Sequence, residues 1–464
     1  MQYIENKTFN EINVGDTAQI TRTLKQQDIE LFAIMSGDVN PAHVDAEYAK
    51  TDIFHKVIAQ GMWGGALISA VLGTELPGPG TIYINQSLHF SRPVGLGDTV
   101  TVRVTVREKR AGKNRVILDC VCSNQSGDTV IEGEAEVIAP TEKVRRPRTL
   151  LPEVHLHEHG ARFQLFITAA AKLEPIKTAV VHPCDAVSLG GAIEAMRRGL
   201  IVPVLVGPRG KIEKAAKEAK VKLGSIEIID TPHSHASAAQ AVKLAGTGKV
   251  AALMKGALHT DELMGAIVGP ESGLKTERRM SHVFVFDVPH YPKPLYITDA
   301  AINIYPSLED KRDIVQNAID LAQALGVERP KVAILSAVET INAKIKSTVE
   351  AAALCKMSER GQITGGSLDG PLAFDNAVSA EAAKTKHIVS LVAGNADILV
   401  VPDLESGNMV AKQLTYLAGA DGAGVVLGAR VPIILTSRAD GDLVRLASCA
   451  IAQLFVHRRS GSAS

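Results

Sequence analysis

The sequence predicts two domains of different class, an α+β domain followed by a larger two-lobed α/β domain. Residues 1–140 combine one long apolar helix with strands of period-two alternation. From about Gln164 onward, short apolar runs alternate with helical stretches. The stretch between them, residues 141–160, is polar, contains proline and shows no periodicity. We therefore expect domains at 1–140 and 161–464, joined by a linker over 141–160.

The first domain opens with a short helix, because Gln27–Ser36 carries apolar residues at helical spacing and is followed by Gly37. A second, longer helix is expected from Gly61 to Leu76, with a buried stripe of Leu67, Ile68, Val71 and Leu72. Strands follow, marked by valines at every second position and by two hairpin turns: Val100, Val102, Val104, Val106, 111–114 and 126–128. One long helix with a meandering antiparallel sheet is the hot-dog arrangement.

The second domain is expected to contain a parallel-rich sheet with helices on both faces, because β-α-β units repeat along it. About 300 residues of this pattern favour two lobes with a cleft between them. The expected strands are 178–181, 202–206, 226–229, 250–254, 283–286, 331–335, 398–401, 425–427 and 432–435. The expected helices between the first of them are 187–198, 211–220 and 236–244.

Composition excludes several classes of protein. Lys+Arg and Asp+Glu both number 50, so the chain lacks the basic surplus of a nucleic-acid binder. The sequence contains no run of about 18 uncharged apolar residues, so no membrane helix is expected, and the N-terminus has no apolar signal segment. Five scattered cysteines favour a reduced, cytoplasmic protein. Alternating His155, His157 and His159 fit a solvated linker better than a metal site, so no metal is predicted.

The first candidate site is the run 36–45, in which Asp38 and His43 follow the first helix. Pro41 stops that helix from continuing, so a tight loop could bring the carboxylate and the imidazole to one point. Such a pair can act as general base and acid on a water molecule, which suits addition of water to an activated double bond. The alternative is that Asp38 caps the next turn and His43 only packs.

The string D-x-N-P-x-H, with Gln60-Gly61-Met62 and Gly80-Thr81-Ile82-Tyr83 downstream, resembles the MaoC-like (R)-specific enoyl-CoA hydratases over residues 10–138. The resemblance implies that Asp38 and His43 activate the water and that the Gly61 N–H binds the thioester carbonyl. It also places Asn40 and Ser69 among the substrate-binding candidates. The sequence departs from the family at Gln60, where a histidine is usual.

The second candidate site lies where polar residues follow predicted strands, the edge at which α/β proteins bind ligands. Asp403 and Asn408 follow one such strand, and Ser437 and Arg438 follow another. A hydroxyl, a guanidinium and free N–H groups at a helix start would form an oxyanion site. Residues 369–375 are expected to form a loop with paired acids, and Arg278, Arg279 and His282 are further cleft candidates.

The strings VPDLESGN, GARVPIILTSRAD and DGPLAFD resemble the phosphate acetyl/butyryltransferase family over residues 160–460. The resemblance implies an isocitrate/isopropylmalate dehydrogenase-like fold and exchange of CoA and phosphate on an acyl group, without a cofactor. It implies Ser437 and Arg438 as catalytic residues. Two positions depart from the acetyl branch, where Val444 replaces an aspartate and Thr415 an arginine. The substrate-binding candidates are Asp403, Asn408, Asp440 and Asp442.

Together the two halves predict a bifunctional acyl-CoA enzyme that hydrates trans-2-enoyl-CoA and transfers acetyl or butyryl groups between CoA and phosphate. Two alternatives remain open. The hot-dog half could be a thioesterase, or one half could be a non-catalytic acyl-CoA-binding or assembly module. The expected partners are acyl-CoA, CoA and phosphate, with no nucleic acid or membrane. An open sheet edge in a single hot-dog unit predicts at least a homodimer.

Overall fold

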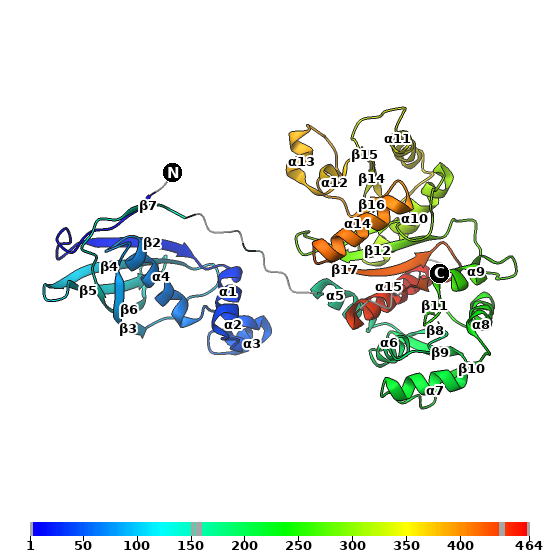
Figure 1. Ribbon diagram of the computed structural model, residues 1–464, viewed down its shortest axis with the longest axis horizontal. Helices are drawn as coiled ribbons and strands as arrows, with labels where there is room; N and C mark the ends of the chain where they lie inside the picture. The colour runs from blue at the N-terminus through cyan, green and yellow to red at the C-terminus, as the bar shows by residue number, and fades with distance from the viewer. Residues whose placement is uncertain (1–2, 150–153, 155–159, 436–440, 462–464) are drawn as a thin grey trace. The chain divides into compact units, whose positions relative to one another are not determined.

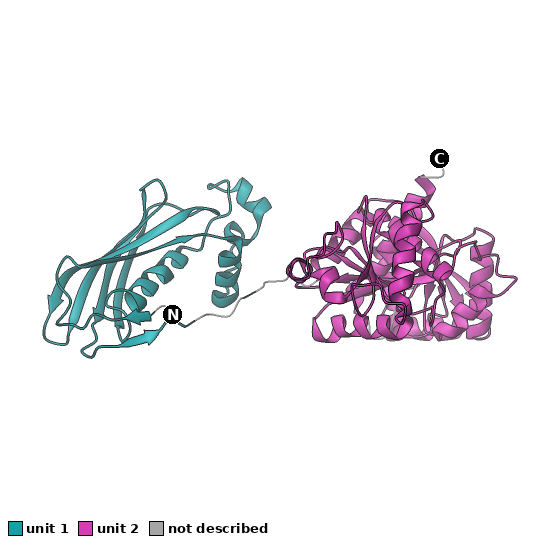
Figure 2. Cartoon of the chain, turned by 90° about the horizontal axis from the view of Figure 1, so that it is seen from above, with its two compact units in different colours: residues 1–156 teal, residues 157–464 magenta. Residues whose placement is uncertain are grey.

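A computed structural model describes residues 3–149, 154, 160–435 and 441–461. The chain forms two compact units, residues 1–156 and 157–464 (Figures 1 and 2). The division falls inside the predicted linker. Part of that predicted linker, Arg145–Pro147, forms β7 and pairs with β1 near the N-terminus. The three linker histidines lie outside the described residues.

The N-terminal unit wraps one five-stranded antiparallel sheet, in the order β2-β4-β5-β6-β3, around helix α4. The helices are α1 (Gln26–Ser36), α2 (Pro41–Val44), α3 (Ala46–Thr51) and α4 (Gly61–Thr74). The strands are β1 (Tyr3–Glu5), β2 (Thr17–Thr23), β3 (Ile82–Phe90), β4 (Thr99–Arg110), β5 (Arg115–Ser123), β6 (Thr129–Ile138) and β7 (Arg145–Pro147).

This arrangement confirms the predicted α+β hot-dog unit. Helix α1 ends at Gly37, whose φ of 77° is the left-handed value that glycine adopts without strain. Ile68, Val71 and Leu72 of α4 are fully or nearly fully buried, while Leu67 packs against the same core from a less buried position. The four alternating valines of β4 all lie in that core, and so do Cys120 and Cys122.

The C-terminal unit contains one mixed sheet of eleven strands, in the order β10-β9-β8-β11-β18-β17-β12-β13-β16-β14-β15. The strands are β8 (Ile176–Val181), β9 (Ile201–Gly207), β10 (Glu227–Asp230), β11 (Ala252–Lys255), β12 (Ser281–Asp287), β13 (Leu295–Thr298), β14 (Lys331–Leu335), β15 (Ser367–Leu372), β16 (Ile398–Val400), β17 (Asp421–Leu427) and β18 (Ile433–Ile434).

Helices cover this sheet on both sides, and α15 runs along the join between its two halves (Figure 1). They are α5 (Ala161–Ala170), α6 (Ala186–Arg197), α7 (Arg209–Glu218), α8 (Ser234–Gly246), α9 (Thr260–Val268), α10 (Leu308–Ala324), α11 (Lys346–Glu359), α12 (Phe374–Val378), α13 (Ala380–Thr385), α14 (Leu404–Leu417) and α15 (Asp442–Gly461). Eleven residues of α15 are buried, so this helix is part of the core.

Most pairings in the large sheet are parallel, as predicted, but its centre is antiparallel, because β17 runs against both β12 and β18. The two halves of the unit therefore share one continuous sheet. Two strands, β13 and β15, were not predicted, and β15 includes residues 369–372 of the segment expected to be a loop. The isocitrate/isopropylmalate dehydrogenase-like label stays a prediction.

No helix in the described part of the chain combines the length and the apolar character needed to cross a membrane. All five cysteines carry free thiols.

Candidate functional sites

The N-terminal candidate site forms where the loop after α1 meets the start of α4. The Asp38 Oδ2 atom lies 4.0 Å from His43 Nε2. His43 is held by a hydrogen bond of 2.9 Å between its Nδ1 and the Ile58 carbonyl oxygen. Because a carbonyl oxygen only accepts, Nδ1 carries the proton and a neutral ring presents a lone pair at Nε2. That lone pair and the Asp38 carboxylate are close enough to bind one water molecule between them.

Asp38 also makes a local hydrogen bond of the kind that the alternative interpretation predicts. The backbone N–H of Asn40 donates to Asp38 Oδ1 at 3.3 Å, so Asp38 does stabilise the turn. Its other oxygen still faces His43, and nearly half of the Asp38 side chain is exposed. His43 is buried, but it lines a cavity and is not closed into the core.

A cavity of about 310 Å³ opens beside His43. Its wall includes the start of α4 and four apolar side chains, Phe54, Trp63, Phe90 and Ile131. Gly61 is the first residue of α4, and no side chain caps this helix end. The Gly61 N–H therefore has no partner within the helix and points from the positive end of the helix dipole. A β-carbon at residue 61 would lie 3.1 Å from the Phe90 ring, so glycine keeps this approach open.

Gln60, which stands at the family's histidine position, is buried just before this helix start. Its side-chain Nε2 donates to the Ile29 carbonyl oxygen at 3.3 Å. Its Oε1 atom is buried and has no partner among the described residues. Gln60 thus ties the start of α4 to α1 while keeping one acceptor in the wall of the cavity.

Two predicted substrate-binding residues of this unit do not line the cavity. Asn40 caps helix α2, because its side-chain oxygen accepts from the Ala42 N–H at 3.1 Å. Ser69 is exposed on α4. Their roles in binding stay predictions.

The C-terminal candidate site is a cleft with a cavity of about 740 Å³ that lies at the carboxyl ends of β11 and β18 and extends along β12. Polar groups line one part of it, aromatic rings of β12 line another, and α14 closes the side. The described lining includes Lys255, His259, Thr260, Asp261, His282, Phe284, Phe286, Asn408, Lys412, Thr415, Asp421, Gly424, Leu435 and Val444. The site thus joins residues from both halves of the sheet.

Of the predicted residues, Asn408 lines this cleft, and its Nδ2 donates to the Ala300 carbonyl oxygen at 3.3 Å. Asp403 instead caps α14, accepting from the Ser406 N–H at 2.9 Å. Asp442 is exposed at the first turn of α15, next to lining residue Gly441. Ser437, Arg438 and Asp440 lie outside the described residues, directly after lining residue Leu435.

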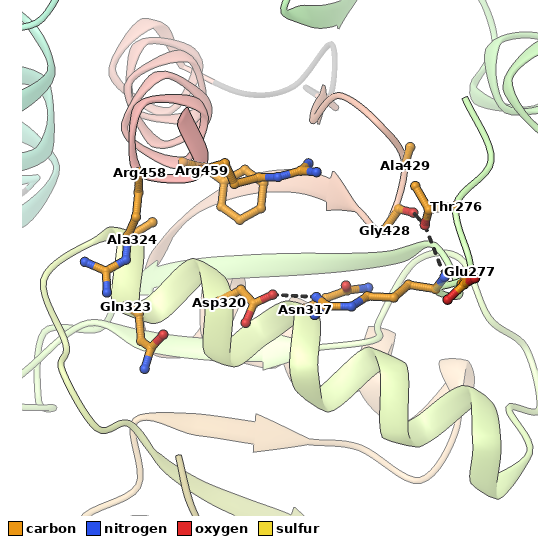
Figure 3. A pocket seen from close by; sticks show the side chains of 12 residues that line it. Thr276, Glu277, Asn317, Asp320, Gln323, Ala324, Gly428, Ala429, Arg458 and Arg459 are labelled. Atoms are coloured by element: carbon orange, nitrogen blue, oxygen red, sulfur yellow. Dashed lines mark hydrogen bonds and ion pairs between the residues drawn. The ribbon is translucent and has the colours of Figure 1, made fainter. Parts of the chain in front are cut away.

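Among Arg278, Arg279 and His282, only His282 lines the cleft. Arg279 pairs with Asp310 and donates to Asn303. Arg278 lines a different cavity of about 610 Å³, between α10 and the end of α15, where it forms an ion pair with Asp320. Figure 3 shows this cavity, with Asp320 on one side and Arg458 and Arg459 on the other. Arg278 and Arg279 are therefore paired with acidic side chains outside the cleft, and only His282 of the three lies in it.

Sequence reasoning missed the polar residues that follow β11. Lys255 is buried at the end of that strand, and His259, Thr260 and Asp261 follow after three intervening residues. The rule that singled out Asp403 and Ser437, polar residues at the carboxyl end of a strand, applies equally to this segment. Asp421 was missed for another reason, since it begins a strand that runs antiparallel to its neighbours.

These two sites define a chain of two enzyme domains, each with a ligand-sized cleft of its own. A family model described as MaoC like domain matches residues 10–121, and one described as phosphate acetyl/butaryl transferase matches residues 233–452. A phosphate acetyltransferase of Rhizobium meliloti is 63% identical over 299 residues, which is 64% of this chain and 95% of that protein. The chain belongs to the phosphate acetyl/butyryltransferase family, and its N-terminal residues match the MaoC-like domain.

Solved structures match each unit separately. A branched-chain phosphotransacylase from Enterococcus faecalis has a TM-score of 0.54 and 31% identity, covering 61% of this chain and 99% of that one. An R-hydratase from Pseudomonas aeruginosa is 46% identical and covers 34% of this chain and 100% of its own, with a TM-score of 0.33.

Proposed function

We propose that the chain is bifunctional, hydrating trans-2-enoyl-CoA to (R)-3-hydroxyacyl-CoA in its N-terminal unit and exchanging CoA and phosphate on a short acyl group in its C-terminal unit. The observation that carries the first activity is the Asp38–His43 pair at 4.0 Å beside an uncapped helix start. The second rests on family membership, together with a cleft in which polar groups meet an aromatic wall.

In the hydration step, one water molecule adds across the C2=C3 bond. Its oxygen forms the new bond at C3 while Asp38 and His43 accept and return protons, so that one hydrogen ends at C2 and one on the new hydroxyl. The addition builds negative charge on the thioester oxygen. The Gly61 N–H, at a positive helix end, is placed to stabilise this charge.

In the transfer step, the substrates are an acyl-CoA with phosphate, or an acyl phosphate with CoA, and the proposed chemistry uses no further cofactor. Relatives named phosphate acetyltransferase and phosphate butyryltransferase leave the acyl group as a choice between acetyl and butyryl. Val444 and Thr415, the two departures from the acetyl branch, both line the cleft. They therefore change its chemistry directly.

Loss of crotonyl-CoA absorbance on addition of the purified chain tests the first activity. Phosphate-dependent release of CoA from a panel of acyl-CoA substrates tests the second. Phosphate-independent cleavage of saturated acyl-CoA by the N-terminal unit would show a thioesterase instead. Binding of acyl-CoA without turnover at either site would show that this half is a binding module.

We also propose at least a homodimer in the cytoplasm. Strand β3 stands at an edge of its sheet, and its residues Ile82, Tyr83 and Ile84 are between 42% and 56% exposed. An apolar edge strand of this kind is stabilised by pairing with a second copy. Light scattering coupled to size-exclusion chromatography measures the mass, and a monomer at micromolar concentration would contradict this part of the proposal.

A further inference from the structure

His282 is a buried polar side chain in the cleft of the C-terminal unit, and the transfer step proposed above gives it no role. It lies on β12 and is 2% exposed, yet it lines the cavity. Its Nδ1 atom is buried without a partner, and no hydrogen bond to either ring nitrogen is found among the described residues. Its ring meets that of Phe284 edge to face, with centroids 4.3 Å apart. A buried ring nitrogen without a partner is costly, which points to a ligand or to strain.

The neighbouring strand leaves one edge of this ring uncovered. Gly424 of β17 lies below it, and a β-carbon at residue 424 would come within 2.5 Å of His282 Nε2. The same position lies 3.5 Å from the Leu435 carbonyl oxygen, so the Nε2 edge faces the end of β18. Glycine at 424 is therefore required for the imidazole to occupy this position at the base of the cleft.

Burial also fixes the charge of the ring. It lowers the pKa of His282 to about 3, so the imidazole is neutral in the physiological range. A neutral imidazole has one N–H donor to offer and is a poor acceptor of the proton of a thiol. Among the described residues, the other titratable groups that line this cavity are Lys255, His259, Asp261, Lys412, Tyr416 and Asp421.

We propose that His282 is a further catalytic residue of the transferase site, which donates a hydrogen bond from its neutral imidazole to the carbonyl oxygen of the acyl group. This inference rests on the proposed transferase activity. When the CoA sulfur attacks the carbonyl carbon of an acyl phosphate, a C–S bond forms and negative charge develops on that oxygen. The C–O bond to phosphate then breaks, and the thiol proton ends on the departing phosphate. His282 keeps its own proton throughout.

A neutral donor fits this role because it stabilises developing charge without gaining or losing a proton. A base role for His282 would need a pKa near the working pH, which its burial prevents. A purely packing role would explain the contact with Phe284, but it would leave the buried Nδ1 atom without a partner among the described residues.

The test compares His282→Gln with His282→Met in the full-length chain, because the two side chains have similar length and only Gln keeps an N–H donor. We expect His282→Met to lower kcat for phosphate-dependent CoA release by ~100-fold, the usual effect of one lost oxyanion donor. KM should change little. His282→Gln should retain activity within ~10-fold of wild type and keep the shape of the wild-type pH profile.

Tyr296→Phe is the matched control. Tyr296 lies on neighbouring strand β13, is 1% exposed, and its hydroxyl is also buried without a described partner, but it does not line the cleft. This variant should keep wild-type transfer. Thermal unfolding of each preparation reports on the folding of the C-terminal unit, and hydration of crotonyl-CoA shows that the N-terminal unit is intact.

Wild-type transfer activity in a folded His282→Met variant would overturn the inference. So would a His282→Gln variant whose plot of kcat against pH lacks one limb of the wild-type profile, because that loss would show that His282 acts as a base. Should His282→Met not fold, Gly424→Ala keeps the imidazole but displaces it, and unchanged kcat in that variant would overturn the inference equally. Absence of transfer in the wild-type chain would instead contradict the proposed function itself.

Discussion

The two units each place a buried histidine in a ligand-sized cavity, but they hold it in opposite ways. His43 is fixed by the Ile58 carbonyl oxygen and faces a carboxylate that is nearly half exposed. His282 has neither a carbonyl nor a carboxylate on its ring among the described residues, and it packs against an aromatic ring above a glycine. The first arrangement suits proton transfer through water, whereas the second suits a donor that never changes its charge. A buried histidine can therefore suit either proton transfer or fixed hydrogen-bond donation, and the groups that contact its ring determine which role it suits.

The largest expected effect comes from removing the carboxylate that distinguishes the first site. Asp38→Asn keeps an acceptor for the Asn40 N–H but cannot take a proton, so crotonyl-CoA hydration should fall by ~10³-fold. Transfer should be unchanged in the same preparation. A variant that hydrates at the wild-type rate would show that the pair at 4.0 Å is structural.

A smaller loss is expected when the helix start of the first site is covered. In Gly61→Ala the added methyl group would lie 3.1 Å from Phe90, so either the ring or the substrate must move. Hydration kcat/KM should fall by ~10-fold to ~100-fold through weaker binding of the thioester oxygen. Gly73→Ala is the control, because it lies in the same helix with open space around its β-carbon position. Equal activity of both variants would remove Gly61 from the proposed site.

The comparison also predicts a difference in how acid affects stability. His282 titrates near 6.5 when unfolded and near 3 when folded, so the unfolded chain binds an extra proton between these values. Stability should therefore fall as the pH decreases from about 6.5 toward 3, by an amount on the order of several kcal/mol from this residue. His282→Met removes this contribution, so its C-terminal unit should unfold with a shallower dependence on pH. The free energy of unfolding of both proteins is measured with urea at each pH. The same dependence on pH in the two proteins would contradict a neutral, buried His282.

The smallest effect is expected at Asp403, which caps α14 and does not line the cleft. Asp403→Ala should cost about 1 kcal/mol of stability through the lost cap, with transfer kinetics unchanged. Asp403→Asn should recover most of that stability, because the amide oxygen can still accept from the Ser406 N–H. A rise in KM for CoA or phosphate without loss of stability would restore Asp403 as a binding residue.

Local patterns predicted the fold better than they predicted the sites. The alternating valines of β4 and the glycine after α1 encode their structure within a few residues, and both predictions are confirmed. The antiparallel centre of the large sheet was missed, because the direction of β17 is set by its pairing with β12, far away in sequence. The short strand β13 was missed for a similar reason, since its four residues are stabilised by strands on both sides.

The sites show the same contrast. Asp38 and His43 are five residues apart, so sequence alone could bring them together, and the structure does. His282, Asn408 and Lys255 meet in one cleft only because β12, α14 and β11, which are far apart in sequence, converge there. The exposed positions of Asn40, Ser69 and Asp442 could not be foreseen, because a motif fixes the type of a residue and not the direction of its side chain.

The claim of two independent active sites is tested most directly by one crossed experiment on the full-length chain. Asp38→Asn and Ser437→Ala are prepared separately, and crotonyl-CoA hydration and phosphate-dependent CoA release are measured on each. We expect that Asp38→Asn loses hydration and keeps transfer, while Ser437→Ala loses transfer and keeps hydration. If both variants retained both activities, or if either variant lost the two together while still folded, the assignment of one reaction to each unit would be wrong.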